Sequence, residues 1–256
     1  MKIIIDRLNN ILGLSLSLAK AEFKLRNEGT YLGIFWYLLA PLLTFLLLLG
    51  IFSNNLGKDI PNYPLYLLLG ILLFNYSNRI ISESLTSIRN NSGIIKSINF
   101  PRESLIGKTV ISVFFSHVFE IIIFILFLLF FGVSIKMMIF YPIILLFLSL
   151  FLFGFSLILS SLGVYFFDLD NVWRFFSSLV LFITPIFYDI GNEGKLFLLN
   201  LFNPLYYFIT IPRDIVIYSK IPETWILMGA LFYTLLSLLI GIIMFNKLKI
   251  KFAELI

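Results

Sequence analysis

The stretch MMIFYPIILLFLSLFLFGFSLILSSLGVYFF, residues 137–167, contains no charged residue and decides the class of fold. A helix needs about 20 mostly apolar residues to cross the hydrocarbon core of a bilayer. The whole chain of 256 residues is 60% hydrophobic and 13% charged, with a mean hydropathy of +1.01. Soluble domains are about 25% charged. A water-soluble fold is therefore excluded, and we expect an all-α integral membrane protein with lipid as its main solvent.

Similar apolar intervals divide the rest of the chain, which is predicted to form a single membrane-spanning domain, residues 1–256. They predict six transmembrane helices, at residues 31–52, 63–85, 108–132, 139–166, 172–189 and 224–245. Before the first span, apolar residues at helical spacing lie opposite lysines. Residues 1–28 are therefore predicted to form an amphipathic helix in the cytoplasmic interface.

The apolar interval 196–212 is interrupted by Asn203-Pro204 and ends at Pro212. Proline breaks helices, and broken backbone is tolerated at membrane depth only where protein or water satisfies it. We therefore predict short broken helices in an outer segment, residues 190–222. With six spans, 14 of the 19 Lys and Arg residues lie on the cytoplasmic side, and with a seventh span here 13 do. The charge distribution therefore barely distinguishes six spans from seven, and the prolines favour six. With six spans, both termini are cytoplasmic.

Catalytic and metal-binding motifs are missing from the sequence. It has no GxxxxGK[ST] loop and no HExxH, contains no Cys and one His, and gives no candidate catalytic residue or metal ligand. An intramembrane His117 and Glu120, three positions apart, could form a proton relay, which would indicate an ion-coupled carrier. A structural hydrogen bond inside the bundle is favoured, because repeated halves are not visible.

Two cytoplasmic connections remain to be explained. Residues 88–106 alternate apolar and charged side chains, and this loop is either a docking element for a soluble partner or a solvated connection. The second connection is short and acidic, with Asp168 or Asp170 as a candidate N-cap of the fifth span.

Short motifs along the whole chain resemble a known family. They are Tyr31-Leu32-Gly33-Ile34-Phe35-Trp36 with Pro41, Ile95-Lys96, Phe100-Pro101-Arg102-Glu103, Thr184-Pro185-Ile186, Asn203-Pro204 and Arg213. Their order is similar to that in the membrane subunits of ABC exporters for lipid-linked polysaccharides, such as O-antigen, capsule and teichoic acid. The chain departs from the family at Phe167-Asp168, where an Arg-Asp pair is usual, and at Gly107, where Pro is frequent.

The resemblance implies a homodimer in the cytoplasmic (inner) membrane, with two copies of a separate cytoplasmic ABC ATPase that holds ATP and Mg. This chain would hold no cofactor, would not be an enzyme by itself, and would contact membrane lipid and the polysaccharide but no nucleic acid. O-antigen export, a step of lipopolysaccharide biosynthesis, is the first expectation. The implied ATPase-coupling residues are Lys96, Phe100, Pro101, Arg102, Glu103 and Asp168, and the implied outer-gate residues are Thr184, Pro185, Asn203, Pro204 and Arg213.

In such a dimer the first and fifth spans would line a channel, where aromatic rings could stack on sugar faces. The candidates are Trp36, Tyr37, Phe175, Phe182 and Tyr188, although packing or an aromatic belt explains each ring equally well. The pyrophosphate of the lipid carrier needs cations at its entrance, for which Lys24, Arg26 and Arg174 are candidates. A permease for drugs or small lipids, an ion-coupled carrier and a structural membrane anchor are the alternatives.

Overall fold

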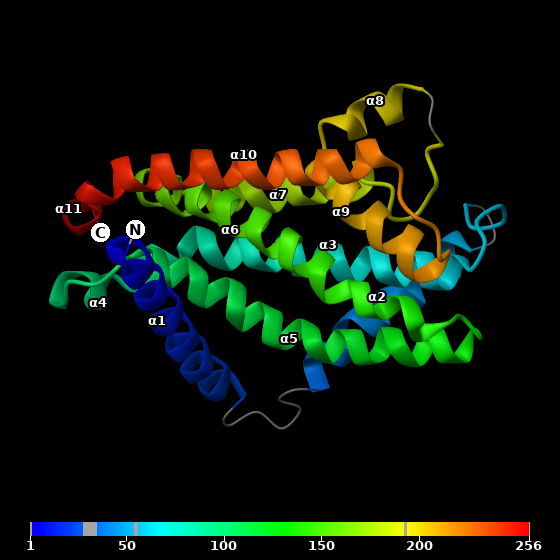
Figure 1. Ribbon diagram of the computed structural model, residues 1–256, viewed down its shortest axis with the longest axis horizontal. Helices are drawn as coiled ribbons and strands as arrows, with labels where there is room; N and C mark the ends of the chain where they lie inside the picture. Colours follow the sequence, from blue (N-terminus) through cyan, green and yellow to red (C-terminus); the bar gives the residue numbers. More distant parts are fainter. Residues whose placement is uncertain (1, 28–34, 54–55, 192–193, 256) are drawn as a thin grey trace.

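The computed structural model describes residues 2–27, 35–53, 56–191 and 194–255, and every regular element in these ranges is a helix (Figure 1). The elements, in chain order, are α1 (Lys2–Asn27), α2 (Phe35–Phe52), α3 (Tyr63–Asn90), α4 (Ser92–Ser97), α5 (Glu103–Phe130), the 3-10 helix η1 (Ile135–Phe140), α6 (Tyr141–Tyr165), α7 (Leu169–Ile183), α8 (Lys195–Leu201), α9 (Pro204–Pro212), the π-helix η2 (Arg213–Ile217), α10 (Thr224–Leu248), the 3-10 helix η3 (Lys249–Lys251) and α11 (Phe252–Leu255).

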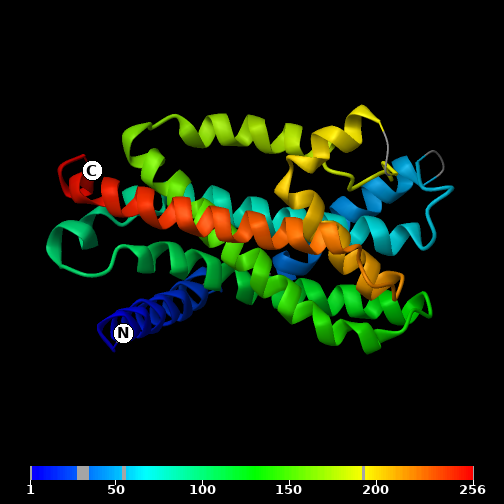
Figure 2. The ribbon, with the colours of Figure 1, turned by 45° about the horizontal axis from the view of Figure 1, so that its top comes forward.

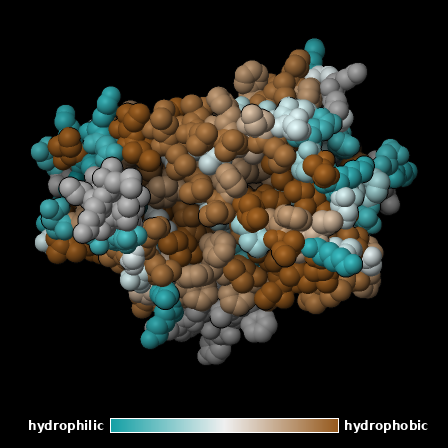
Figure 3. Space-filling view, in the orientation of Figure 1, coloured by the Kyte–Doolittle hydropathy of each residue, from teal (hydrophilic) through white to brown (hydrophobic). Residues whose placement is uncertain are grey.

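Four helices in the described ranges are long and apolar enough to cross a membrane. They are Tyr63–Asn90, Glu103–Phe130, Ile135–Tyr165 and Thr224–Lys251. The helices α2 and α7 are shorter, with 18 and 15 residues. The visible face carries a hydrophobic band between two hydrophilic ends (Figure 3). The predicted all-helical membrane protein is thus confirmed, and four of the six predicted spans coincide with these long helices.

The two ends of the bundle carry different elements. The start of α1 lies with α4 and α11 at one end, which we call the α4 end, and α8 and α9 lie towards the other, the α9 end (Figures 1 and 2). α1 runs obliquely to the long helices and packs along α5, where the Ser15 hydroxyl donates to the Ser104 carbonyl over 3.2 Å. A Cβ on Gly107 would collide with the Ser15 side chain. The close contact between α1 and α5 therefore requires glycine here and would not accommodate proline.

The core is built around α3, which packs against α5 and α6. Leu67, Leu68 and Leu69 have no exposed surface, so this span is enclosed by protein rather than lipid. α6 and α10 approach each other closely at Gly154, where an added Cβ would lie 2.5 Å from the carbonyl carbon of Ser237. Small residues bring membrane helices together in this way when both partners are otherwise apolar.

The largest differences from the predicted spans are at three helix ends. α3 continues past residue 85 to Asn90, and α5 begins at Glu103 rather than 108, so the connection 88–106 is mostly helical and contains α4. α7 ends at Ile183 and not at residue 189. Thr184 has an extended backbone with ψ 134°, as expected before Pro185, because a following proline disfavours the helical conformation. The predicted short helices between the fifth and sixth spans are present as α8 and α9.

Candidate functional site

The guanidinium of Arg213 ties together three segments at the α9 end. Its side chain is 3% exposed and donates hydrogen bonds to the backbone carbonyls of Tyr66 (3.0 Å), Pro185 (2.5 Å) and Ile186 (3.1 Å). These carbonyls belong to the start of α3 and to the extended chain after α7. A buried charge is costly unless hydrogen-bonded. Arg213 therefore has acceptors for its buried charge, and it satisfies two carbonyls of the extended chain that follows α7.

Gly70 makes room for this arginine. A Cβ at position 70 would lie 2.5 Å from a terminal nitrogen of Arg213, and the guanidinium carbon already lies 3.4 Å from the Tyr66 ring centroid. The Tyr66 hydroxyl in turn donates to the carbonyls of Pro185 and Tyr188. The start of α3 and the chain that follows α7 are thus joined by one compact set of hydrogen bonds.

Asn203 holds the next break in the chain. Its side-chain nitrogen donates to the Thr184 hydroxyl over 2.8 Å and to the side-chain oxygen of Asn200 over 3.1 Å. Its own oxygen accepts from the backbone N–H of Leu205, and Pro204 occupies the first turn of α9. Asparagine is a favoured N-cap, and proline suits the first helical position. The structure therefore brings the predicted outer-gate residues into one hydrogen-bonded region.

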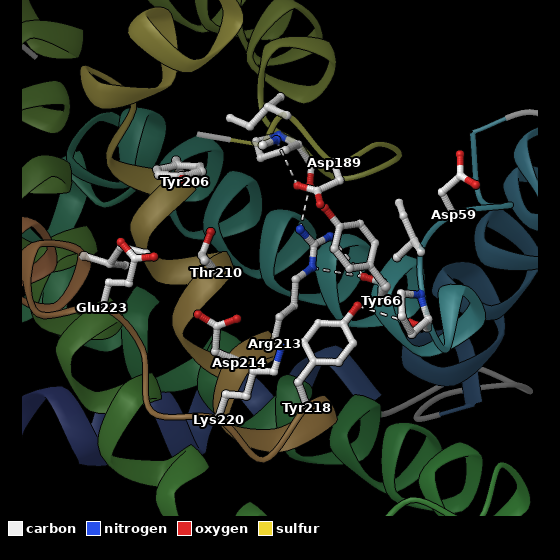
Figure 4. A pocket seen from close by; sticks show the side chains of 16 residues that line it. Asp59, Tyr66, Asp189, Tyr206, Thr210, Arg213, Asp214, Tyr218, Lys220 and Glu223 are labelled. Atoms are coloured by element: carbon white, nitrogen blue, oxygen red, sulfur yellow. Dashed lines mark hydrogen bonds between the residues drawn. The ribbon is translucent and has the colours of Figure 1, made fainter. Parts of the chain in front are cut away.

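A cavity of about 440 Å³ opens beside Arg213 (Figure 4). Its polar lining comes from α3, η2, α9 and the connecting loops. The lining residues are Asp59, Ile60, Pro61, Tyr66, Pro185, Asp189, Ile190, Gly191, Tyr206, Thr210, Arg213, Asp214, Tyr218, Lys220, Glu223 and Ile226. Burial raises the pKa of Tyr206 to about 12 and raises the pKa of Asp214 above its ordinary value. The Tyr206 phenol therefore stays protonated at neutral pH.

The predicted channel aromatics do not share one environment. Phe175 and Phe182 are 67% and 62% exposed on one face of α7, and Trp36 is 53% exposed on α2. These rings are therefore open to a partner or to lipid. Tyr188 is half-buried, and its hydroxyl donates to the carbonyls of Phe182 and Ile183 at the end of α7. The side chain of Tyr37 lies outside the described residues.

Two of the predicted coupling residues at the α4 end contact the C-terminal segment of the same chain. The guanidinium of Arg102 donates to the Lys249 carbonyl and lies over the Phe252 ring at 6.0 Å. The Lys249 ammonium donates to the Glu103 carboxylate over 2.7 Å. Phe100 and Pro101 line a neighbouring pocket of about 450 Å³. Lys96 is exposed on α4.

The other connection at this end is held by Arg89. Its side chain donates to the Phe167 carbonyl over 3.1 Å, lies over the Phe167 ring, and approaches the Asp170 carboxylate to 3.9 Å. Asp168 occupies the N-cap position of α7, is exposed, and makes no side-chain capping bond. Arg174 pairs with Asp170 at 3.0 Å and is largely exposed. Lys24 is also exposed, and the side chain of Arg26 lies outside the described residues.

His117 and Glu120 form a closed polar network inside the bundle. Nδ1 of His117 lies 2.7 Å from the Glu120 carboxylate, and Nε2 lies 2.9 Å from the Tyr141 hydroxyl. The His117 ring packs 4.7 Å from the Tyr76 ring, whose hydroxyl bonds Ser149. Both imidazole nitrogens thus have a partner within the protein, the arrangement that a structural role requires.

Several residues of these clusters were not predicted from the sequence. Tyr66, Gly70 and Asn200 lie within ordinary apolar stretches, and Arg89 and Lys249 look like the positive flanks of spans. Only the pair Asn200 and Asn203 could have been recognised from the sequence as candidate site residues, since two amides in an otherwise apolar interval need hydrogen-bond partners.

Broken helices at one polar end, a charged cluster at the other and apolar helices between them are the arrangement expected of a membrane-transport subunit. The chain matches the ABC-2 type transporter family over residues 14–217 and belongs to that family. It is 29% identical over 240 residues to the O-antigen export system permease protein RfbA of Klebsiella pneumoniae, covering 92% of each chain. Its identity to the RfbA permease of Myxococcus xanthus is 23% over 246 residues, covering 94% of this chain and 95% of the relative.

Proposed function

We propose that this chain is the transmembrane subunit of an ATP-driven ABC exporter that moves O-antigen across the cytoplasmic membrane. The observation that carries the proposal is its similarity to RfbA over 92% of both chains, because the match includes the broken helices as well as the spans. A match confined to apolar segments would say little about the cargo. The ABC-2 membership supports a partner ATPase that supplies the energy.

The proposed topology has six spans, with α2 and α7 added to the four long helices. The apolar part of α2, Leu38–Phe52, and the 15 residues of α7 are short for a bilayer of about 30 Å, and local thinning or association with other helices accommodates such helices. The α4 end is then cytoplasmic, in line with its cluster of basic residues, and the α9 end is the outer one.

The proposed dimer places α2 and α7 at a shared channel. Phe175 and Phe182, seven positions apart on α7, and Trp36 on α2 are each more than half exposed in the protomer. Rings of this kind contact the C–H faces of sugars without holding any single residue tightly, which suits the passage of a polymer. A second copy of the chain would face them across the channel.

The cytoplasmic ATPase is proposed to dock at the α4 end. The exposed Lys96 and the neighbouring Ile94 and Ile98, 41% and 58% exposed, offer a mixed surface on and beside α4. Arg102 and Glu103, bound to the C-terminal segment, would carry movement of this surface into α5 and α10. Lys24, Arg26 and Arg174 remain candidates for the carrier pyrophosphate, with the charge of Arg174 partly balanced by Asp170.

Polymer export tests the proposal directly. The chain and its ATPase would be expressed in cells that lack their own export pair, and surface polymer would be measured by antibody labelling. The double variant Phe175→Ala, Phe182→Ala should reduce export several-fold while its membrane level stays unchanged. Phe232→Ala is the matched control, since this ring is 58% exposed on α10 and lies outside the proposed channel.

Surface polymer that is absent even with the unmodified pair would overturn the O-antigen assignment. ATPase activity that rises with small amphiphiles and needs no polymer would favour the drug or small-lipid permease instead. Equal losses of export in the α7 double variant and in Phe232→Ala would show that the rings act through general packing and not through the channel.

A further inference from the structure

The cavity at the α9 end has the chemistry of a small binding site that the export channel does not use. Tyr206, Thr210 and Asp214 follow one another at four-residue intervals along α9 and η2, so they share one face of this segment. Figure 4 shows the oxygens of Thr210 and Asp214 pointing towards the same space, with Tyr206 above them. Its volume of about 440 Å³ lies within the range of roughly 300–1,000 Å³ that ligand pockets occupy.

The phenol of Tyr206 is available for a ligand. The residue is 5% exposed and lines the cavity, and its hydroxyl forms no hydrogen bond within the described part of the chain. The Tyr206 oxygen is not among the fully buried side-chain atoms that lack a partner, so it is accessible from the cavity. Tyr66 and Tyr218, which line the same cavity, use their hydroxyls on backbone carbonyls. The Tyr206 group thus differs from its neighbours in being left for an occupant.

The charges of the cavity select against anions. Four carboxylates line it, from Asp59, Asp189, Asp214 and Glu223, against two cations. The guanidinium of one of these cations, Arg213, already donates its hydrogen bonds to backbone carbonyls. A cavity with this excess of negative charge repels phosphates and uronates and tolerates neutral or amine-bearing ligands.

The remaining walls are apolar, from Ile60, Pro185, Ile190 and Ile226, and face the same space as the hydroxyls and carboxylates. A pyranose ring presents the matching pattern, with hydroxyls at its edge and C–H groups on its faces. We propose that this cavity binds one or two neutral or amine-bearing sugar residues at the outer end of the protomer. The inference rests on the proposed polysaccharide export, and it adds a saccharide site in each protomer beside the shared channel.

Binding of matched disaccharides tests the site. The permease–ATPase complex in lipid nanodiscs, without ATP, would be titrated with cellobiose, fully deacetylated chitobiose and cellobiuronic acid and followed by saturation-transfer NMR. These three share a β-1,4 linkage and differ in charge. Cellobiose and deacetylated chitobiose should bind, and cellobiuronic acid should bind at least about tenfold more weakly. No binding of the first two, or equal binding of all three, would overturn the proposal.

Two variants locate the site. Thr210→Phe fills the cavity and should weaken binding of cellobiose at least about tenfold, whereas Ser17→Phe, on the exposed face of α1, should leave it unchanged. The triple variant Asp59→Asn, Asp189→Asn, Asp214→Asn keeps the side-chain shapes and should bring cellobiuronic acid to within about threefold of cellobiose. Unaltered selectivity in the triple variant, or unaltered binding in Thr210→Phe, would show that the sugars bind elsewhere.

Failure of this site and failure of the proposed function are distinguishable, because probe binding needs neither ATP nor a finished polymer. Polymer export without disaccharide binding would overturn the saccharide site alone. Cavity-dependent disaccharide binding by a complex that exports no polymer would support the site and overturn the export assignment.

Discussion

The guanidinium carbon of Arg213 lies 3.4 Å from the centroid of the Tyr66 ring, and its nitrogens donate to the backbone carbonyl of the same residue. One side chain of the segment 190–222 therefore contacts both the ring and the backbone at the start of α3, the most buried of the four long helices. Through Pro185 and Ile186 it also fixes the chain that leaves α7. Movement of the segment 190–222 relative to α3 must break this set of bonds.

We expect Arg213→Met to destabilise the protein by about 1–3 kcal/mol, because it leaves buried carbonyls without a donor. Arg213→Lys should recover only part of this loss, since an ammonium lacks the planar fork that reaches three carbonyls. Thermal unfolding in detergent, followed by tryptophan fluorescence, measures the effect. Equal midpoints for Arg213→Met and the unmodified protein would show that the arginine does not hold the outer segment.

Gly70→Ala should mimic the loss of Arg213, because the new Cβ would occupy the place of the guanidinium. Gly50→Ala is the matched control, since a Cβ there meets nothing within 4 Å and alanine favours helix. The double variant Gly70→Ala, Arg213→Met should be less destabilised than the sum of the two single variants, since both disturb one contact. Additive losses in the unfolding midpoint would contradict this account.

The contact between Glu103 and Lys249 is expected to hold the cytoplasmic connection in place for the ATPase. Lys249→Ala and Arg102→Glu should each weaken co-purification of the ATPase or uncouple hydrolysis from export several-fold. The control Lys247→Ala removes a neighbouring lysine from the last turn of α10. Normal assembly and export in both the Lys249 and Arg102 variants would show that the C-terminal segment has no part in coupling.

Glu120→Gln is expected to keep full polymer export, because the amide can still accept a hydrogen bond from His117 within the closed network. Export should also continue when an uncoupler collapses the proton gradient while ATP is maintained. A loss of export in Glu120→Gln at an unchanged protein level, together with sensitivity to the uncoupler, would establish proton coupling and refute a purely structural role.

The membrane class and the positions of most helices could be predicted, because lipid imposes a local rule. Each stretch such as 137–167 must satisfy its backbone within itself, so length and absence of charge are enough to recognise it. The break before α9 was also predictable from Asn203-Pro204, since proline acts within a few residues. Pro212 does not end the helical segment, because the π-helix η2 follows it directly as far as Ile217. The end of the fifth span was placed too late, although Pro185 carried the relevant local signal.

What the sequence by itself determined is the apolar helical framework, its breaks and the polar ends. The tertiary structure alone decided that Arg213 meets Tyr66, 147 positions earlier, and that Arg102 meets the Lys249 carbonyl at the same separation. It also joined Tyr206, Asp189 and Asp214 around one cavity. Spacing along the chain cannot predict such contacts, because they depend on the rotation and approach of packed helices. At position 70, the contact with Arg213 requires a residue without a Cβ.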